Sequence, residues 1–162
     1  MSVRLPRTIL LCAAIATALI VPAAPAFAAE NSAGDYCWEN LDTAEVHCFG
    51  TEAELSADLA PQTFARSAAT TLYTLATWYE NTGYGGAYFV TRSSNSALCV
   101  SGSTTLNFSS SWNNRVSSYK TWYGCAGTIY DGTSGTGSSF GPSTAASSVG
   151  SMNDKASSFR LS

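Results

Sequence analysis

The feature that most constrains how this chain can fold is a polar hexamer that occurs twice. The copies read NNRVSS (residues 113–118) and NDKASS (residues 153–158), and both fit Asn, Asn or Asp, two free positions, Ser, Ser. Each copy is followed by alternating side chains, in the runs YKT and FRL. This period of two predicts strands with one buried face. The inward positions would be Tyr119, Thr121, Phe159 and Leu161.

Each hexamer also has a matching partner upstream. Tyr79 and Glu80 align with Tyr130 and Asp131, and a glycine stands six residues past each acid. Each half therefore reads aromatic, acid, turn, glycine, strand, and later hexamer and strand. An internal repeat of this length predicts two copies of one supersecondary unit. We interpret the Gly- and Ser-rich residues 132–148 as loops and a short strand inside the second copy, because the repeat resumes directly after them.

The composition after residue 69 favours an all-β fold. This part is rich in Ser, Thr, Gly, Tyr and Trp, has few charges and shows no helical period. Short strands separated by Gly and Ser turns are typical of a sandwich or barrel. Before it, residues 36–49 predict a hairpin, and Thr51 with Glu54 predicts a capping box that opens a short helix ending at about Leu59.

The first 28 residues have the pattern of a secretory signal peptide. Arg4 and Arg7 precede an apolar run, and AFA at residues 26–28 is a small-x-small cleavage site. The sequence thus predicts a secreted, extracellular protein divided into residues 1–28 (signal peptide), 29–68 (hairpin and helix) and 69–162 (repeat domain). Without Arg4 and Arg7, six basic residues face eleven acidic ones, a net charge of about −5. Such a chain suits cations or basic partners better than nucleic acid or anionic membranes.

Four cysteines remain beyond the predicted signal peptide. An even number in an exported chain predicts two disulfides. Three pairings are formally possible, and we favour Cys37–Cys48 and Cys99–Cys125, since each pair falls within one apparent structural unit. The spacing and the single histidine argue against a zinc site.

At this point the sequence resembles the βγ-crystallin family. Tyr79, Tyr84 and Gly86 fit the Greek-key pattern of that family fully, whereas Gly135 stands where the second aromatic residue is expected in the other half. The hexamers fit the calcium motif of its microbial branch. The resemblance covers residues 69–162 and implies two Greek keys that form a βγ-crystallin-type β-sandwich, a non-enzymatic module that binds Ca²⁺.

The resemblance also implies which residues bind calcium. In the family, each ion lies between loops of two motifs. One loop is a hexamer, which supplies the backbone carbonyl of its third position and the hydroxyl of its fifth. The other loop is the hairpin of the other motif, which supplies its acid. The sixth position hydrogen-bonds to the folded hairpin. Carried over by position, the implied residues are the carbonyls of Arg115 and Lys155, the hydroxyls of Ser117 and Ser157, the acids Glu80 and Asp131, and Asn113, Asn114, Asn153 and Asp154, which shape or complete the sites.

Other interpretations stay open from the sequence. Asn and Ser are common turn formers, so the hexamers could be turns without a metal. GSSFG (137–141) matches G-x-S-x-G, but no helix pattern follows it and the lone His47 lies far away in the hairpin. Some secreted proteins that resemble this architecture are inhibitors of extracellular metallopeptidases, grouped as peptidase inhibitor family I36, and others are killer-toxin-like antimicrobial proteins. An extracellular protease or a cell-surface target is therefore the alternative partner.

Overall fold

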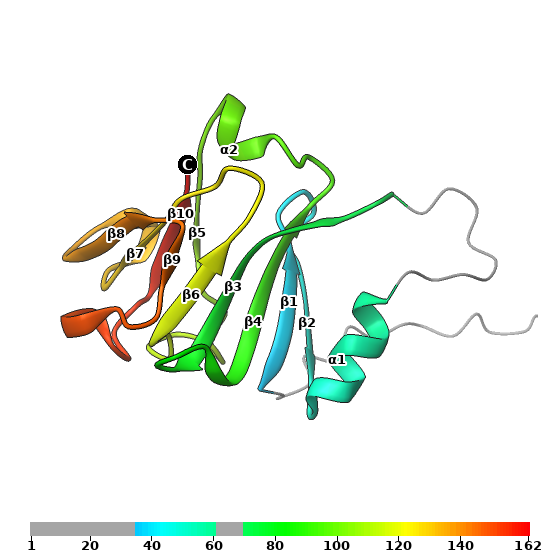
Figure 1. Ribbon diagram of the computed structural model, residues 1–162, viewed down its shortest axis with the longest axis horizontal. Helices are drawn as coiled ribbons and strands as arrows, with labels where there is room; N and C mark the ends of the chain where they lie inside the picture. The colour runs from blue at the N-terminus through cyan, green and yellow to red at the C-terminus, as the bar shows by residue number, and fades with distance from the viewer. Residues whose placement is uncertain (1–34, 61–69) are drawn as a thin grey trace, which may run out of the picture.

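The computed structural model of this chain describes residues 35–60 and 70–162. The predicted signal peptide lies outside the described residues. Figure 1 shows strands in two layers, with one helix beside the N-terminal hairpin. The N-terminal elements are β1 (Tyr36–Asn40), β2 (Glu45–Phe49) and α1 (Glu52–Leu59).

The two predicted copies of the repeat each form four strands. In the first copy a one-turn helix precedes the third strand, and in the second copy 3₁₀ turns follow the first and third strands. The elements of the first copy are β3 (Tyr73–Asn81), β4 (Gly85–Ser93), α2 (Leu98–Ser101), β5 (Thr104–Asn107) and β6 (Ser118–Thr121). Those of the second are β7 (Gly127–Tyr130), η1 (Thr133–Gly135), β8 (Ser139–Ser143), β9 (Ala145–Ala146), η2 (Gly150–Met152) and β10 (Ser158–Leu161).

The strands form two sheets that exchange one strand between the copies. The six-stranded sheet has the order β2-β1-β4-β3-β6-β9, and the four-stranded sheet has the order β5-β10-β7-β8. The third strand of each copy, β5 or β9, thus pairs with the fourth strand of the other copy. This is the arrangement of two interlocked Greek keys, so the predicted all-β sandwich with two Greek-key motifs is confirmed.

The N-terminal hairpin extends the first sheet. β1 pairs with β2 antiparallel and with β4 parallel, with Cys37 opposite Phe89. Thr51 and Glu54 form the predicted capping box of α1. The helix buries Leu55 against Trp38 and Val90 on the outer face of the sheet. Both predicted disulfides are present, Cys37–Cys48 across the hairpin and Cys99–Cys125 between the copies.

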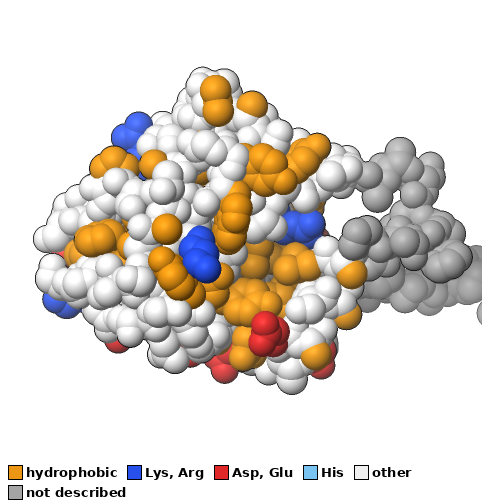
Figure 2. All heavy atoms as spheres, viewed as in Figure 1, with side chains coloured by type: hydrophobic (Ala, Val, Ile, Leu, Met, Phe, Trp, Pro, Cys, Tyr) orange, Lys and Arg blue, Asp and Glu red, His pale blue; other side chains and the backbone are white. Residues whose placement is uncertain are grey.

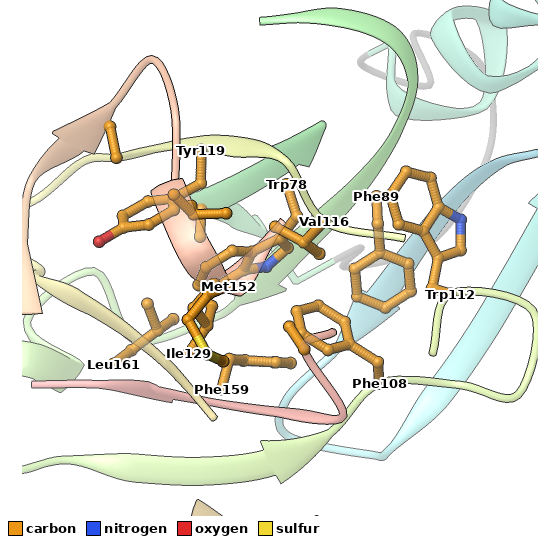
Figure 3. Packing of buried hydrophobic residues seen from close by; sticks show 14 of the residues in the cluster. Trp78, Phe89, Phe108, Trp112, Val116, Tyr119, Ile129, Met152, Phe159 and Leu161 are labelled. Atoms are coloured by element: carbon orange, nitrogen blue, oxygen red, sulfur yellow. The ribbon is translucent and has the colours of Figure 1, made fainter. Parts of the chain in front are cut away.

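The main core lies between the sheets and draws on both copies. Trp78 of β3 packs against Phe159 of β10 with ring centroids 4.9 Å apart and against Tyr119 of β6 at 5.1 Å. Figure 3 shows these rings directed into one cluster with Phe108 and Ile129. Burying several aromatic side chains at one junction favours a single cooperative unit. The alternation predicted for FRL is confirmed, because Phe159 and Leu161 are buried and Arg160 is exposed.

Candidate metal centre

The hairpins that carry Glu80 and Asp131 adopt the same backbone conformation. Tyr84 and Gly135, at equivalent positions, have φ of 66° and 75°, and the following glycines, Gly86 and Gly137, have 76° and 83°. A Cβ atom at Gly137 would overlap the Asp131 carboxylate, so this approach requires glycine. The departure at Gly135 therefore leaves the shape of the second hairpin intact.

The last serine of each hexamer closes its hairpin. The Ser118 hydroxyl donates to the Asn81 carbonyl at 2.6 Å and accepts from the Tyr84 N–H at 3.0 Å. The Ser158 hydroxyl donates to the Gly132 carbonyl at 2.6 Å and accepts from the Gly135 N–H at 2.9 Å. Both serines are fully buried. The structural role predicted for the sixth hexamer position is thereby observed in both halves.

The two hexamers lie against each other. The Asn114 N–H donates to the Ala156 carbonyl at 2.9 Å, and the Asp154 N–H donates to the Val116 carbonyl at 3.2 Å. Asn114 and Asp154 both have positive φ, a conformation in which Asn and Asp are enriched. Each hexamer therefore presents its second residue to the other copy.

This crossing forms two oxygen-rich clusters. The first cluster is Glu80, Ser117 and Asp154: the Ser117 N–H donates to the carbonyl of Tyr79, beside Glu80, and its hydroxyl donates to Asp154 Oδ1 at 3.2 Å. Glu80, Ser117, Asn153 and Asp154 line one open hollow of about 560 Å³.

The second cluster is Asp131, Ser157 and Asn114, and it repeats these contacts. The Ser157 N–H donates to the carbonyl of Tyr130, beside Asp131, and its hydroxyl lies 3.5 Å from Asn114 Oδ1. Asp131 Oδ1 accepts the Ser138 N–H at 2.7 Å. Its other oxygen makes no hydrogen bond to any residue in the described ranges.

The grouping of these residues differs from the expected one. The resemblance implied that a hexamer meets the acid of the other half, but each acid lies with the hexamer serine of its own half. The reason is the bond from each serine N–H to the hairpin carbonyl that precedes the acid. The other half contributes the second hexamer residue, Asp154 or Asn114. Asn113 and Asn153 precede these two residues, and Asn153 donates to Asp154 Oδ2 at 2.7 Å.

The carbonyls implied as ligands are not used elsewhere in the described chain. Within residues 35–60 and 70–162, neither the Arg115 nor the Lys155 carbonyl oxygen accepts a hydrogen bond. Backbone carbonyls usually find partners, so these two are available to a ligand. Carboxylate, amide, hydroxyl and carbonyl oxygens are the donors that calcium prefers. By donor type, the residues of both loops fit a calcium ion.

The Arg115 side chain makes the first cluster unlike the second. Its guanidinium donates to Glu80 Oε1 at 2.7 Å and to Asp35 Oδ1 at 2.9 Å. Partial burial lowers the pKa of Arg115, but the hydrogen bonds and charges of these two carboxylates raise it, and the net shift is upward. Arg115 therefore carries a permanent positive charge beside Glu80. Motif spacing did not reveal this contact, because it joins residues that are 35 and 80 positions apart.

Other kinds of site find less support in the described residues. Among residues 35–60 and 70–162, there is no group of three or more His, Cys, Asp and Glu side chains. GSSFG runs into the edge strand β8 and not into a strand-turn-helix elbow. His47 stacks on Trp38 and pairs with Glu45 at 2.8 Å in the hairpin. None of the helices in these ranges has the length and apolar character of a membrane span.

A second hollow lies on the outer face of the six-stranded sheet. It has a volume of about 530 Å³ and is lined by Tyr79, Tyr84 and Tyr88 with Glu52 and Val90. Figure 2 shows hydrophobic side chains gathered in a hollow on this face. Lys120 Nζ lies 4.1 Å from the Tyr84 ring centroid. The tyrosines of the first hairpin thus face outward, whereas Trp78 and Trp112 are fully buried.

Comparisons with known proteins found distant similarity to a few solved structures. No family model and no curated protein matches the chain. Similar solved structures include the N-terminal domain of protein S, at 19% identity and a TM-score of 0.42, over 54% of this chain and 94% of that one. βγ-Crystallin domains from Clostridium beijerinckii (24%, TM-score 0.40, 54% and 95%) and Flavobacterium johnsoniae (22%, 0.40, 54% and 93%) are also similar.

These values describe a distant likeness over about half of the chain. The features of this structure that define its βγ-crystallin-like fold are the exchange of β5 and β9 between the sheets and the two serine-closed hairpins. The relation to peptidase inhibitors stays a prediction.

Proposed function

We propose that this protein is a secreted, non-enzymatic module that binds calcium through the first and second clusters. The observation that carries the proposal is the reciprocal contact of the hexamers, which brings Ser117 to Asp154 and Ser157 to Asn114. Each pair lies beside a hairpin acid and offers oxygen atoms only. Such sets suit a hard cation and not a thiolate- or imidazole-seeking metal.

The chemistry of these clusters predicts modest affinity. Each cluster has one hairpin carboxylate, and only the first has a second carboxylate, Asp154. Extracellular calcium modules with few charges bind in the range of about 10⁻⁴–10⁻³ M. Calcium at such concentrations would tie the two hexamers together and stabilise the fold. Two disulfides, Cys37–Cys48 and Cys99–Cys125, support a location in an oxidising compartment.

Thermal unfolding with and without calcium tests the proposal. Protein stripped with a chelator should gain about 2.7 kcal/mol per site in free energy of unfolding at a hundred times the dissociation constant. Magnesium at the same ionic strength is the control and should give a much smaller shift. A variant that lacks both hydroxyls, Ser117→Ala with Ser157→Ala, should lose most of the calcium effect. An unchanged melting temperature of the wild-type protein at millimolar calcium would contradict the proposal.

A further inference from the structure

The Arg115 guanidinium is held in place by four contacts. Besides the bonds to Glu80 and Asp35, it donates to the Ser111 carbonyl at 3.1 Å and lies over the Trp112 ring at 4.9 Å. Its side chain is only 24% exposed. An arginine fixed by two carboxylates, a carbonyl and an aromatic face is not a mobile surface side chain.

These contacts use the carboxylate that a calcium ion would need. Glu80 Oε2 accepts the Ala87 N–H at 3.3 Å, and Oε1 accepts Arg115 at 2.7 Å. Both oxygens of the first hairpin acid are therefore engaged within the protein. One positive charge already neutralises Glu80 at the rim of the hollow that both residues line.

Among the described residues, the second half has no counterpart to the arginine contacts of the first half. Lys155 stands at the position of Arg115, is exposed, and has no ion pair with any residue in the described ranges. Met152 replaces the Trp112 ring, and Asp131 is one methylene shorter than Glu80. The added hairpin, which precedes β3 and borders β4, supplies the first half with Asp35.

We infer that Arg115 acts as a built-in cation of the first cluster, which lowers the affinity of that cluster for calcium and makes the two clusters unequal. The inference rests on the calcium-binding function proposed above and adds its regulation. A calcium ion that takes Glu80 has to displace the guanidinium or approach it against charge repulsion. Without Arg115, the first cluster would offer two carboxylates, Glu80 and Asp154, against one in the second cluster. The arginine thus weakens the cluster that is richer in negative charge.

Calorimetric calcium titration of variants with one cluster intact tests this inference. The Asp131→Asn background weakens the second cluster and keeps an oxygen for the Ser138 N–H. In that background, Arg115→Gln should tighten calcium binding about tenfold, because a unit charge within a few ångströms is removed. The matched control is Lys155→Gln in the Glu80→Gln background, and it should change the affinity of the second cluster by less than about threefold.

The outcomes separate the two proposals. Arg115→Gln and Lys155→Gln could change the calcium affinities of their clusters by equal amounts. In that case the arginine does not lower the affinity of the first cluster, although the proposed calcium binding stands. If neither the wild type nor any variant gives saturable heat at about 10 mM calcium, the proposed function itself fails. A second variant, Asp35→Asn, removes only an exposed anchor of Arg115 and should tighten binding about two- to threefold. Melting curves would establish that each variant is folded, and an unchanged affinity in folded Asp35→Asn and Arg115→Gln proteins would overturn the inference.

Discussion

The two halves of this molecule share a backbone device and differ in the charges attached to it. In both halves a hairpin with matching positive φ values is closed by a serine hydroxyl that makes two hydrogen bonds. The same conformation forms around Tyr84 in one half and Gly135 in the other. The closing serine and the required glycine therefore determine the shape, and the aromatic residue two positions before that glycine is replaceable.

The first half differs because a hairpin has been added to its edge. β4 pairs with β1 of the added hairpin, whereas the equivalent β8 is the last strand of its sheet in the described part of the chain. The addition brings Asp35 to Arg115 and buries Glu39 in the protein. It follows that one fold can carry two copies of a loop with different charged neighbours.

The largest effect is expected from removing either closing serine. Ser118→Ala and Ser158→Ala each leave a carbonyl and an N–H without their partner, and each should lower the free energy of unfolding by about 2–4 kcal/mol. The two values should agree within about 1 kcal/mol if the device is the same in both halves. Chemical denaturation of both variants measures this. A large loss of stability in one half alone would show that the two hairpins are not closed in the same way.

A pH-dependent effect should come from the hairpin that is added to the first half. Glu39 is the one buried carboxyl among the described residues, and burial raises its pKa to about 7 from 4.5. Its Oε2 has no hydrogen-bond partner among the residues that the structure describes. The folded state keeps this proton up to a higher pH than the unfolded state does. The free energy of unfolding is therefore highest below pH 4.5 and falls as the pH rises from 4.5 towards 7.

Glu39→Gln should therefore stabilise the protein at neutral pH. The amide stays neutral, so the gain in free energy of unfolding should be about 2–3 kcal/mol at pH 8 and near zero at pH 4. Denaturation of wild type and variant across this pH range checks it. A constant difference at all pH values would point to packing and not to the proton.

A smaller effect distinguishes Tyr84 from its equivalent Gly135. Tyr84 has φ of 66°, which is strained for a side chain, and its ring contacts Tyr79 at 5.7 Å. Tyr84→Ala loses the ring contact and keeps the strain, whereas Tyr84→Gly loses both. The glycine variant should therefore be more stable than the alanine variant by about 1 kcal/mol. Thermal melts of the two variants measure the difference, and the opposite order would show that strain at this position is negligible.

The smallest effect is expected from the arginine in the absence of calcium. Arg115→Gln should lower the free energy of unfolding by about 0.5–1 kcal/mol, since Glu80 and Asp35 are both partly exposed and solvent screens their pairs. Lys155→Gln should change it by less than about 0.5 kcal/mol. Denaturant titration in chelator measures both. Equal losses would mean that Lys155 makes a comparable pair in solution.

Local patterns predicted much of the fold. The doubled hexamer indicated two copies of one unit because it recurs with its own upstream hairpin, and the resemblance to βγ-crystallins implied that each copy is a Greek key. Thr51 and Glu54 predicted the capping box by their spacing along the chain, and Cys37 with Cys48 flank one turn. All of these features depend on residues that are close in sequence or repeated.

The remaining features depend on contacts between distant segments. The parallel pairing of β1 with β4 has no local signal, because it joins residues that are far apart in the chain, such as Cys37 and Phe89. The contact from Arg115 to Glu80 depends on both hairpin position and side-chain direction. A basic residue at the third hexamer position could have suggested such a contact, but Lys155 occupies the equivalent place and stays exposed. The sequence predicts the candidate ligands. It does not predict the Arg115 contacts that distinguish the first cluster from the second.

The most direct test of this account is a calorimetric titration of the wild-type protein, stripped with chelator, with calcium. The account predicts saturable heat from two unequal sites, with the weaker at the Arg115 cluster. Two equivalent sites would contradict the predicted inequality of the two clusters. The absence of saturable heat at millimolar calcium would contradict the metal centre itself, and the hexamers would then be turns that only close the two hairpins.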